Sequence, residues 1–506
     1  MWENEKMSEK KEKLYRAGWY MIVFGFMYVW FTQIKPLVAY DGDDWLYLSF
    51  VRRAVPIWKD WNPARVLPEV LMPLCGGIAA YVVMPITGDY IGSITIVSAL
   101  VTSGFITVYV WCFDRLMQRL FCLNAVRQII MSALFLLLHF MVFRGEPSHN
   151  NYLFHCWDLT CVYYYLIPAL LNCSLVMYMM VNSDCREMMA AEAPGKASVC
   201  LLAAYFAIFS NLPSSVILGI YAGVRMLTDL MRSWKKVEWK VYLKDHAVHE
   251  VILFGWVLSA VMELTGVRAQ DDMGYRLPFL QGLKETTYRL LLVLKNSNEA
   301  FIMFAVVVAV VALVVLLRSR KKHQERELLW MVGETMLCAV IMLAAVIILC
   351  AKVDITYVTR SEYLFGLYFY GLLILLVALT FVLSRQPKLW AVLPLLLCIL
   401  ASYINTDGMT FPDSNLQSCE PSVCKAIDED IIDQIIAASQ AGQKVVTIRV
   451  PVTDNAENWP HAGFVGDRIA NTLYEHGLLN VPIRVVVQPS VEMNRKYNLY
   501  IPETSE

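Results

Sequence analysis

The sequence predicts an all-α polytopic membrane protein that carries a small α/β domain at its C-terminal side. Of the 506 residues, 58% are hydrophobic and only 17% are charged, and the mean hydropathy is positive. These values lie far outside the range of soluble globular proteins. Most apolar residues also fall into runs of about 18 to 22, each long enough to cross roughly 30 Å of hydrocarbon. We therefore expect a multi-pass protein of the cell membrane, with membrane lipid and no nucleic acid among its partners.

About eleven such runs follow one another along the chain. The first is too long for a signal peptide and no small-residue cleavage site follows it, so we expect it to remain as an anchor. Together the runs define a transmembrane domain over residues 17–404. They cover residues 18–34, 91–113, 125–143, 159–181, 198–210, 213–230, 248–264, 300–317, 329–351, 363–383 and 389–404.

Positive charge between the runs predicts the orientation, because cytoplasmic loops retain Lys and Arg. Residues 1–16 are rich in lysine, so the N-terminus is placed in the cytoplasm. The loops at 115–127, 232–244, 318–322 and 385–388 are basic as well. All four loops can be cytoplasmic only if segment 66–84 does not cross the bilayer.

Segment 66–84 is apolar but irregular. It contains Pro68, Pro73, Gly76 and Gly77, and both residue types weaken a helix. We expect a helix that lies in the outer interface or re-enters it, and a regular crossing remains the alternative. The outer face then holds the first outer loop, 35–90, the loops at 144–158, 265–298 and 352–362, and the C-terminal tail.

Residues 405–506 have a mixed polar composition and are numerous enough for a small extracytoplasmic α/β domain. Their periodicity predicts helices at 427–441 and 467–476, and strands at 445–450 and 483–487. Cys419 and Cys424 are close enough in sequence to form a local disulfide. A metal pair with partners elsewhere, or two free thiols, fits the spacing equally well.

An acidic cluster, Asp41-Gly42-Asp43-Asp44-Trp45, follows the first apolar run directly. Carboxylates this close repel one another and cost stability, so their presence indicates a function. Asp43 or Asp44 can supply a general base whose pKa is adjusted by its neighbour and by partial burial. A solvated helix end is the alternative. A divalent metal could also bind Asp41, Asp43 and Asp44, but one short loop rarely completes such a site, so no metal or cofactor is assigned.

Four arginines on the predicted outer face lie next to apolar segments, although charge there is costly. They are Arg65, Arg268, Arg276 and Arg360. Guanidinium groups suit phosphate because their planar donors engage two oxygens at once, and snorkelling to the interface is the alternative for any one of them. Further site candidates on this face, each of which has a structural role as its simpler interpretation, are Glu69, Asp158, Asp271 and Asp272.

An outward-facing site restricts the substrate, because nucleotide-activated donors are not normally present on that side of a membrane. A lipid-linked phosphate donor is present there. A carboxylate base, arginines for a phosphate leaving group and aromatic surfaces for a sugar fit glycosyl transfer from such a lipid. The aromatic surfaces are Trp45, Trp58, Trp61, Tyr164 and Tyr165, although aromatic belts also occur at membrane interfaces for other reasons.

Seven short motifs occur in a fixed order along the membrane region. They are Asp43-Asp44-Trp45, Asn62-Pro63-Ala64-Arg65, Tyr163-Tyr164-Tyr165-Leu166-Ile167-Pro168, Ser210-Asn211-Leu212-Pro213, Gly266-Val267-Arg268, Gly274-Tyr275-Arg276 and Val358-Thr359-Arg360. In this order they resemble the GT-C superfamily of polyprenyl-phosphate-sugar-dependent glycosyltransferases, which includes bacterial serotype-converting glucosyltransferases and related bacterial membrane families. Two positions depart from the family pattern: Ala64 stands where Gly is usual, and Leu212-Pro213 stands where an acidic residue is usual.

The resemblance implies a GT-C-like fold with interfacial helices and an inverting reaction on the outer face. Asp44 or Asp43 would deprotonate a hydroxyl of a glycan or wall-polymer acceptor, and Arg268, Arg276 and Arg360 would bind the phosphate of the polyprenyl-phosphate sugar donor. A transporter or flippase of lipid-linked saccharides is the main alternative, and a sensor or assembly protein is the third. A transporter predicts charges in the middle of spans and inverted repeats, whereas most charges here lie at span ends.

Overall fold

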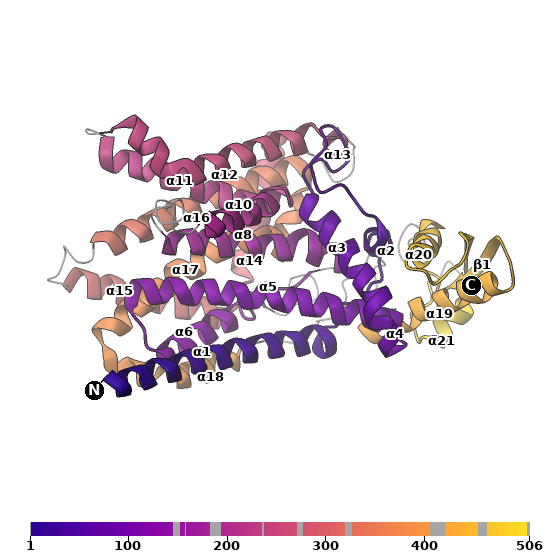
Figure 1. Ribbon diagram of the computed structural model, residues 1–506, viewed down its shortest axis with the longest axis horizontal. Helices are drawn as coiled ribbons and strands as arrows, with labels where there is room; N and C mark the ends of the chain where they lie inside the picture. Colours follow the sequence, from indigo (N-terminus) through magenta and orange to yellow (C-terminus); the bar gives the residue numbers. More distant parts are fainter. Residues whose placement is uncertain are drawn as a thin grey trace.

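The computed structural model describes residues 2–144, 152–156, 158–182, 194–234, 237–270, 277–318, 326–404, 420–453 and 463–502. Helices dominate, as predicted, and one small sheet lies in the C-terminal part (Figure 1). The membrane part consists of α1 (Trp2–Val29), η1 (Trp30–Ile34), α2 (Gly42–Ser49), α3 (Val66–Ile78), η2 (Ala79–Val83), α4 (Met84–Thr87), α5 (Tyr90–Phe121), α6 (Ala125–Leu138), α7 (Leu159–Cys161), η3 (Val162–Leu166), α8 (Ile167–Val181), α10 (Pro194–Ile208), α11 (Leu212–Ser233), α12 (Trp239–Thr265), α13 (Val267–Gln270), α14 (Phe279–Lys295), α15 (Glu299–Arg318), α16 (Arg326–Val353), η5 (Ile355–Thr359), α17 (Ser361–Arg385), η6 (Pro387–Ala391) and α18 (Leu393–Ala401).

Nine helices in the described part of the chain are long and apolar enough to cross a membrane. Eight of them match predicted spans. The predicted spans 125–143, 198–210 and 389–404 form the shorter helices α6, α10 and α18, of 14, 15 and 9 residues. The structure therefore has the features of a multi-pass membrane protein, and it does not confirm the predicted number of eleven spans.

The ninth helix is the segment that the sequence predicts as interfacial. Residues Val66–Thr87 form one uninterrupted helix, built from α3, η2 and α4, whose length and apolar composition would suffice for a crossing. Figure 1 shows it running across the end of the bundle, crosswise to the long helix α5. Gly76 lets α2 pack closely on this helix, because a Cβ at that position would lie only 2.3 Å from the carbonyl oxygen of Leu48.

The bundle has two chemically different ends. The N-terminus lies at one of them, here called the basic end, and the C-terminal part lies at the other, here called the domain end (Figure 1). Since the long helices alternate in direction, the C-terminal ends of α5, α11 and α15 and the N-terminal ends of α6, α12 and α16 lie at the basic end. The helix ends next to three of the predicted cytoplasmic loops therefore share one end of the molecule.

Aromatic side chains fill the middle of the bundle. Phe113 of α5 stacks on Phe135 of α6, with ring centroids 4.1 Å apart. Tyr109, Phe369 and Tyr370 are fully buried beside them. This packing separates the two ends of the bundle.

The C-terminal part contains the predicted α/β elements. They are α19 (Pro421–Gln440), β1 (Val445–Val450), α20 (Gly463–Glu475), β2 (Arg484–Pro489) and α21 (Val491–Lys496). The two strands pair in parallel, with Val445 opposite Arg484, and alternate side chains of β1 are buried. Cys424 is buried in this part, and Cys419 lies outside the described residues, so the predicted disulfide stays a prediction.

The C-terminal part, here called the C-terminal domain, packs on the first interhelical loop. The Thr472 hydroxyl of α20 donates to the carbonyl oxygen of Trp45 and lies 2.8 Å from the Ser49 hydroxyl. His476 Nδ1 lies 2.5 Å from the Tyr90 hydroxyl. The domain therefore fixes α2, the helix that starts with the acidic cluster.

Candidate active site

A cavity of about 350 Å³ lies at the domain end, where α2 meets the bundle. Its wall contains three aspartates, three arginines and five tyrosines. They are Asp41, Asp43, Asp158, Arg65, Arg268, Arg360, Tyr40, Tyr47, Tyr164, Tyr165 and Tyr357, joined by Thr160 and Cys161. Seven of these are predicted site residues: Asp41, Asp43, Arg65, Asp158, Tyr164, Arg268 and Arg360. The fold thus brings residues from five separate stretches of the chain to one place.

The N-terminus of α2 positions the acidic cluster. Asp41 is the residue before the helix; its backbone is extended, and its carboxylate accepts a hydrogen bond of 2.5 Å from the N–H of Gly42. Asp43 and Asp44 occupy the first turn, where the helix dipole favours negative charge. The mutual repulsion of the three carboxylates is therefore partly offset by the start of the helix.

Asp44 has a structural position rather than one on the cavity wall. It is fully buried, and its carboxylate accepts hydrogen bonds from the Thr160 N–H at 2.6 Å, the Thr160 hydroxyl at 2.7 Å and the Tyr40 N–H at 3.1 Å. These donors satisfy both oxygens, as a buried carboxyl group requires, while burial and the charges of Asp158 and Asp41 raise the pKa of Asp44. Asp44 therefore ties the start of α2 to the start of α7.

Asp41 and Asp158 face the cavity with perturbed acidity. Asp158 precedes α7, and its carboxylate accepts a hydrogen bond of 2.5 Å from the Cys161 N–H. Burial, aided by the charges of Asp158 and Asp43, raises the pKa of Asp41 to about 7. Burial also raises the pKa of Asp158. A carboxyl group with a pKa near 7 is well matched to accept a proton at neutral pH.

Asp43 links the cavity to the C-terminal domain. Its side chain is 57% exposed, and its carboxylate lies 2.9 Å from Nη1 of Arg468 on α20. An ion pair this exposed contributes little stability. Asp43 can therefore exchange its partner for a ligand at small cost.

Arg360 is held at the cavity by three kinds of contact. Its Nε and Nη2 lie 2.8 and 2.5 Å from Oε1 of the buried Glu362. Nη2 also lies 3.0 Å from the Cys161 sulfur. The guanidinium stacks near the rings of Tyr165 and Tyr357, 5.6 and 5.4 Å from their centroids. These contacts fix the orientation of the Arg360 guanidinium group at the cavity.

Arg65 is anchored in a similar way on the facing wall. Its Nε lies 3.1 Å from Glu263, and its guanidinium carbon lies 5.5 Å from the centroid of the Tyr164 ring. Glu69, the other candidate in this helix, does not line the cavity. It forms a buried ion pair of 2.5 Å with Arg52 and accepts a hydrogen bond of 3.2 Å from the Tyr164 hydroxyl. Glu69 therefore holds Tyr164, a residue that does line the cavity, in place.

Arg268 differs from the other two arginines. Its guanidinium carbon lies 5.2 Å from the centroid of the Trp61 ring, and within the described residues no carboxylate lies at ion-pair distance from it. Gly266, the residue before α13, lies so close to the Pro63 ring that a Cβ on residue 266 would be only 2.9 Å from it. The helix that carries Arg268 therefore starts beside Pro63. Arg268 is thus the cation on this wall best placed to meet an incoming anion.

The tyrosine-rich motif forms a wide helical turn. Residues Val162–Leu166 make the π-helical segment η3, and such turns are frequent at functional sites. Asn211 holds this turn: its side-chain amide donates to the Tyr164 carbonyl oxygen, and its Oδ1 accepts from the Ser214 N–H at 2.8 Å. Asn211 therefore positions the tyrosines and does not line the cavity.

Three predicted site residues, Arg276, Asp271 and Asp272, lie outside the described residues. Sequence reasoning missed two groups that the structure places at the site. The first comprises the wall residues Tyr40, Tyr47, Thr160, Cys161 and Tyr357; the second comprises the partners Arg52, Glu263, Glu362 and Arg468. No local pattern marks Glu263 or Arg468, because each lies far along the chain from its partner, whereas Glu362 follows Arg360 by only two residues.

The acidic cluster does not converge on one point. Asp41 and Asp43 face the cavity, whereas the carboxylate of Asp44 faces Thr160. In the part of the chain that the structure describes, no three His, Cys, Asp or Glu side chains are grouped closely enough to hold a metal ion.

The site combines a carboxyl group with a raised pKa, three arginines that each lie near an aromatic ring and a lining of tyrosine rings at one end of a membrane bundle. No protein-family model, no curated protein and no solved structure matches this chain. The resemblance of its motifs to the GT-C superfamily is therefore an expectation from the residues, and the function is inferred from the site itself.

Proposed function

We propose that this protein is a glycosyltransferase that moves a sugar from a polyprenyl-phosphate donor to a glycan or wall-polymer acceptor on the outer face of the cell membrane. The observation that carries the proposal is the composition of the domain-end cavity. A candidate proton acceptor, three arginines suited to phosphate and several tyrosine rings line one cavity of about 350 Å³.

The proton acceptor in this proposal is Asp41. Its carboxylate takes the proton of the acceptor hydroxyl while that oxygen forms a bond to the anomeric carbon of the sugar. The bond between the anomeric carbon and the phosphate oxygen breaks, and its electron pair leaves with the lipid phosphate. The pKa of about 7 supports this role for Asp41, and Asp43, which lines the same cavity, is the second candidate.

The leaving phosphate would be bound by Arg268 first, with Arg360 and Arg65 beside it. Arg360 and Arg65 already share their charge with Glu362 and Glu263, so their fields are partly cancelled. Arg268 has no such partner among the residues that the structure describes, and it gains most from an anion. Cations aimed at the position where negative charge develops are the largest single contribution to many such reactions.

The loop that leads to the cavity suits a lipid-linked donor. Ile57, Trp58 and Trp61 are 38%, 46% and 36% exposed, and exposed tryptophans of this kind sit at the level of lipid headgroups. Trp61 also carries Arg268 on its ring. A polyprenyl chain in the bilayer could therefore deliver its phosphate directly to this arginine.

The test is a transfer assay with the full-length protein in nanodiscs and a panel of synthetic polyprenyl-phosphate sugars. Release of polyprenyl phosphate by the wild-type protein, and its loss in Asp41→Asn, supports the proposal. Asp89→Asn is the matched control, because Asp89 also precedes a helix and accepts from a backbone N–H, at 2.7 Å, but does not line the cavity.

Binding of the donor without turnover, unchanged in Asp41→Asn, would instead favour transport of a lipid-linked saccharide. Transport requires a path through the bundle, and the described residues fill its middle with buried aromatic side chains such as Tyr109, Phe113 and Tyr370. This packing is the reason that transfer at one end is preferred here.

A further inference from the structure

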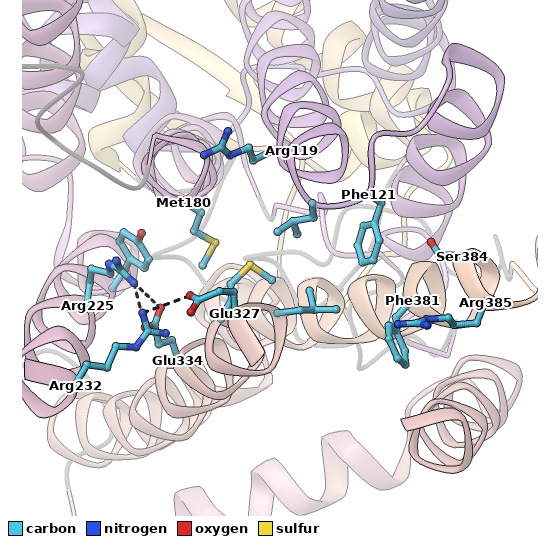
Figure 2. Close-up of a pocket in the computed structure, with 14 residues that line it drawn as sticks. Arg119, Phe121, Met180, Arg225, Arg232, Glu327, Glu334, Phe381, Ser384 and Arg385 are labelled. Carbon is cyan, nitrogen blue, oxygen red and sulfur yellow. Dashed lines mark hydrogen bonds and ion pairs between the residues drawn. The ribbon is translucent and has the colours of Figure 1, made fainter. Parts of the chain in front are cut away.

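A second cavity, of about 530 Å³, lies at the basic end of the bundle. Five helices contribute to its wall: α5, α8, α11, α16 and α17 (Figure 2). Its charged residues are Arg119, Arg225, Arg232, Arg385, Glu327 and Glu334. Four arginines thus face two glutamates, and the excess of positive charge favours an anionic ligand.

Two of the arginines belong to a fixed network on one side of the cavity. Arg225 engages both carboxylate oxygens of Glu334 at 3.1 Å, and it lies 3.0 Å from Asp229. Arg232 lies 3.5 Å from Glu334 and 3.8 Å from Glu327. Glu334 is buried and so needs these partners. This network is a rigid wall whose charges are largely balanced.

The other two arginines lie across the cavity from this network. Figure 2 shows Arg119 and Arg385 on separate helices, away from the cluster of Arg225, Arg232 and Glu334. No carboxylate of the described residues is at ion-pair distance from Arg119. The guanidinium of Arg385 lies 5.5 Å from the centroid of the Phe381 ring. Arg119 on the α5 side therefore carries positive charge that no described carboxylate offsets.

The wall between the charges is apolar. Met180 and Met331 line the cavity, and both also line a narrow, almost entirely apolar space that continues between α5, α8, α16 and α17. That space offers only about 10 Å³, so the apolar part of a ligand would lie against Met180 and Met331 in the main cavity. A ligand that matches this lining has an anionic head and an apolar segment attached to it.

We infer that this cavity, which Arg385 also lines, binds the phosphate group of an anionic membrane lipid, with the phosphate at Arg119 and the start of the acyl or prenyl chain against Met180 and Met331. The arginines lie at the ends of α5 and α17, two helices that are apolar enough to cross a membrane. That position is the depth at which lipid phosphates occur. The inference does not depend on the glycosyltransferase proposal, because no residue is shared between the two cavities.

The test compares lipid binding to the full-length protein in neutral detergent by native mass spectrometry and by thermal shift. The probes are short-chain phosphatidic acid, phosphatidylglycerol, phosphatidylcholine and inorganic pyrophosphate. We expect the two anionic lipids to bind, and the Arg119→Gln, Arg385→Gln double variant to bind them at least about tenfold more weakly. Arg127→Gln is the matched control, since Arg127 lies at the same end, on the Trp390 ring, and outside the cavity.

Equal binding of anionic lipid by the double variant and the wild type would overturn the inference. Pyrophosphate binding as tight as that of phosphatidic acid would overturn the lipid as the source of the phosphate. Binding of phosphatidylcholine without binding of either anionic lipid would overturn recognition by charge. The unfolding temperature of the double variant without lipid confirms that the fold is intact, and Arg225 is left unchanged because its removal would strand the buried Glu334.

Discussion

At the domain end, three aspartates line the cavity beside three arginines, whereas at the basic end four arginines face two glutamates that both take part in ion pairs. The two regions use the same side-chain chemistry, and at the domain end burial raises the pKa of Asp41 and Asp158 on the cavity wall. A site for reaction needs a group that can change its protonation state. A site for binding needs only fixed complementary charge, which is what the basic end offers.

The sharpest test of this difference is Asp41→Asn. Asparagine caps a helix as well as aspartate does, so the fold of α2 is retained while the proton acceptor is lost. We expect transfer to fall by about 10²- to 10⁴-fold, with lipid binding at the basic end unchanged. Steady-state release of polyprenyl phosphate measures the first effect. Wild-type activity in this variant would remove Asp41 from the reaction.

Asp44→Asn should lower the stability of the fold and should not remove a group that takes part in the reaction. The new amide N–H₂ would face the donors of Thr160 and Tyr40, so we expect a loss of roughly 2–3 kcal/mol of stability. The midpoint of thermal unfolding in detergent reports this loss. A variant that is as stable as the wild type but inactive would instead return Asp44 to the reaction.

The pH dependence distinguishes the two cavities without a mutation. Below a pKa of about 7 the Asp41 carboxyl is protonated and cannot accept a proton, so transfer should fall by about tenfold for each pH unit of acidification. Binding of phosphatidylglycerol at the basic end should change little over the same range, because guanidinium groups and a phosphodiester both keep their charge. Because folding raises this pKa, the group's contribution to stability is fully present below about pH 4 and is lost as the pH rises towards 7. Inactivity at pH 6 therefore does not arise from unfolding at Asp41.

Arg360→Lys tests whether the planar, ring-stacked guanidinium of Arg360 is needed, beyond its positive charge. An ammonium keeps the charge, but it cannot stack on Tyr165 and Tyr357 or engage two phosphate oxygens together. We expect kcat/KM to fall by about tenfold or somewhat more, at an unchanged unfolding temperature. Full activity of this lysine variant would show that Arg360 serves only as a general positive charge.

The smallest expected effect is that of Arg468→Gln. The variant breaks the Asp43–Arg468 pair, whose carboxylate is 57% exposed, and such pairs contribute about 0.2–1 kcal/mol. We therefore expect a change in kcat/KM of less than about fivefold. A much larger loss would show that the C-terminal domain takes a direct part in the reaction.

Much of the fold could be predicted from the sequence, because long apolar runs and regular periodicities are local properties. Eight of the predicted spans and all four elements predicted for the C-terminal part are present. The helix Val66–Thr87 has a composition that fits a membrane crossing, but Figure 1 shows it crosswise to α5. The amino-acid composition of a helix does not determine the direction in which it packs.

The candidate site could be predicted in part for a similar reason. Arg65, Arg268 and Arg360 were singled out because charge beside an apolar segment is costly, and the fold places them around one cavity. The sequence could not distinguish Asp41 from Asp44, because the difference depends on Thr160, more than a hundred residues away. The pairing of Arg65 with Glu263 depends on the tertiary fold, because 198 positions separate the two residues, whereas the pairing of Arg360 with Glu362 is local in the sequence.

The contact between Ser49 and Thr472 joins positions 423 residues apart in the chain. The helix that starts with the acidic cluster, α2, is therefore synthesised long before α20, the helix that packs on it. During biosynthesis α2 lacks this contact while all the spans between the two helices are made and inserted. A chain on which α20 has not yet been made lacks this support for the acidic cluster.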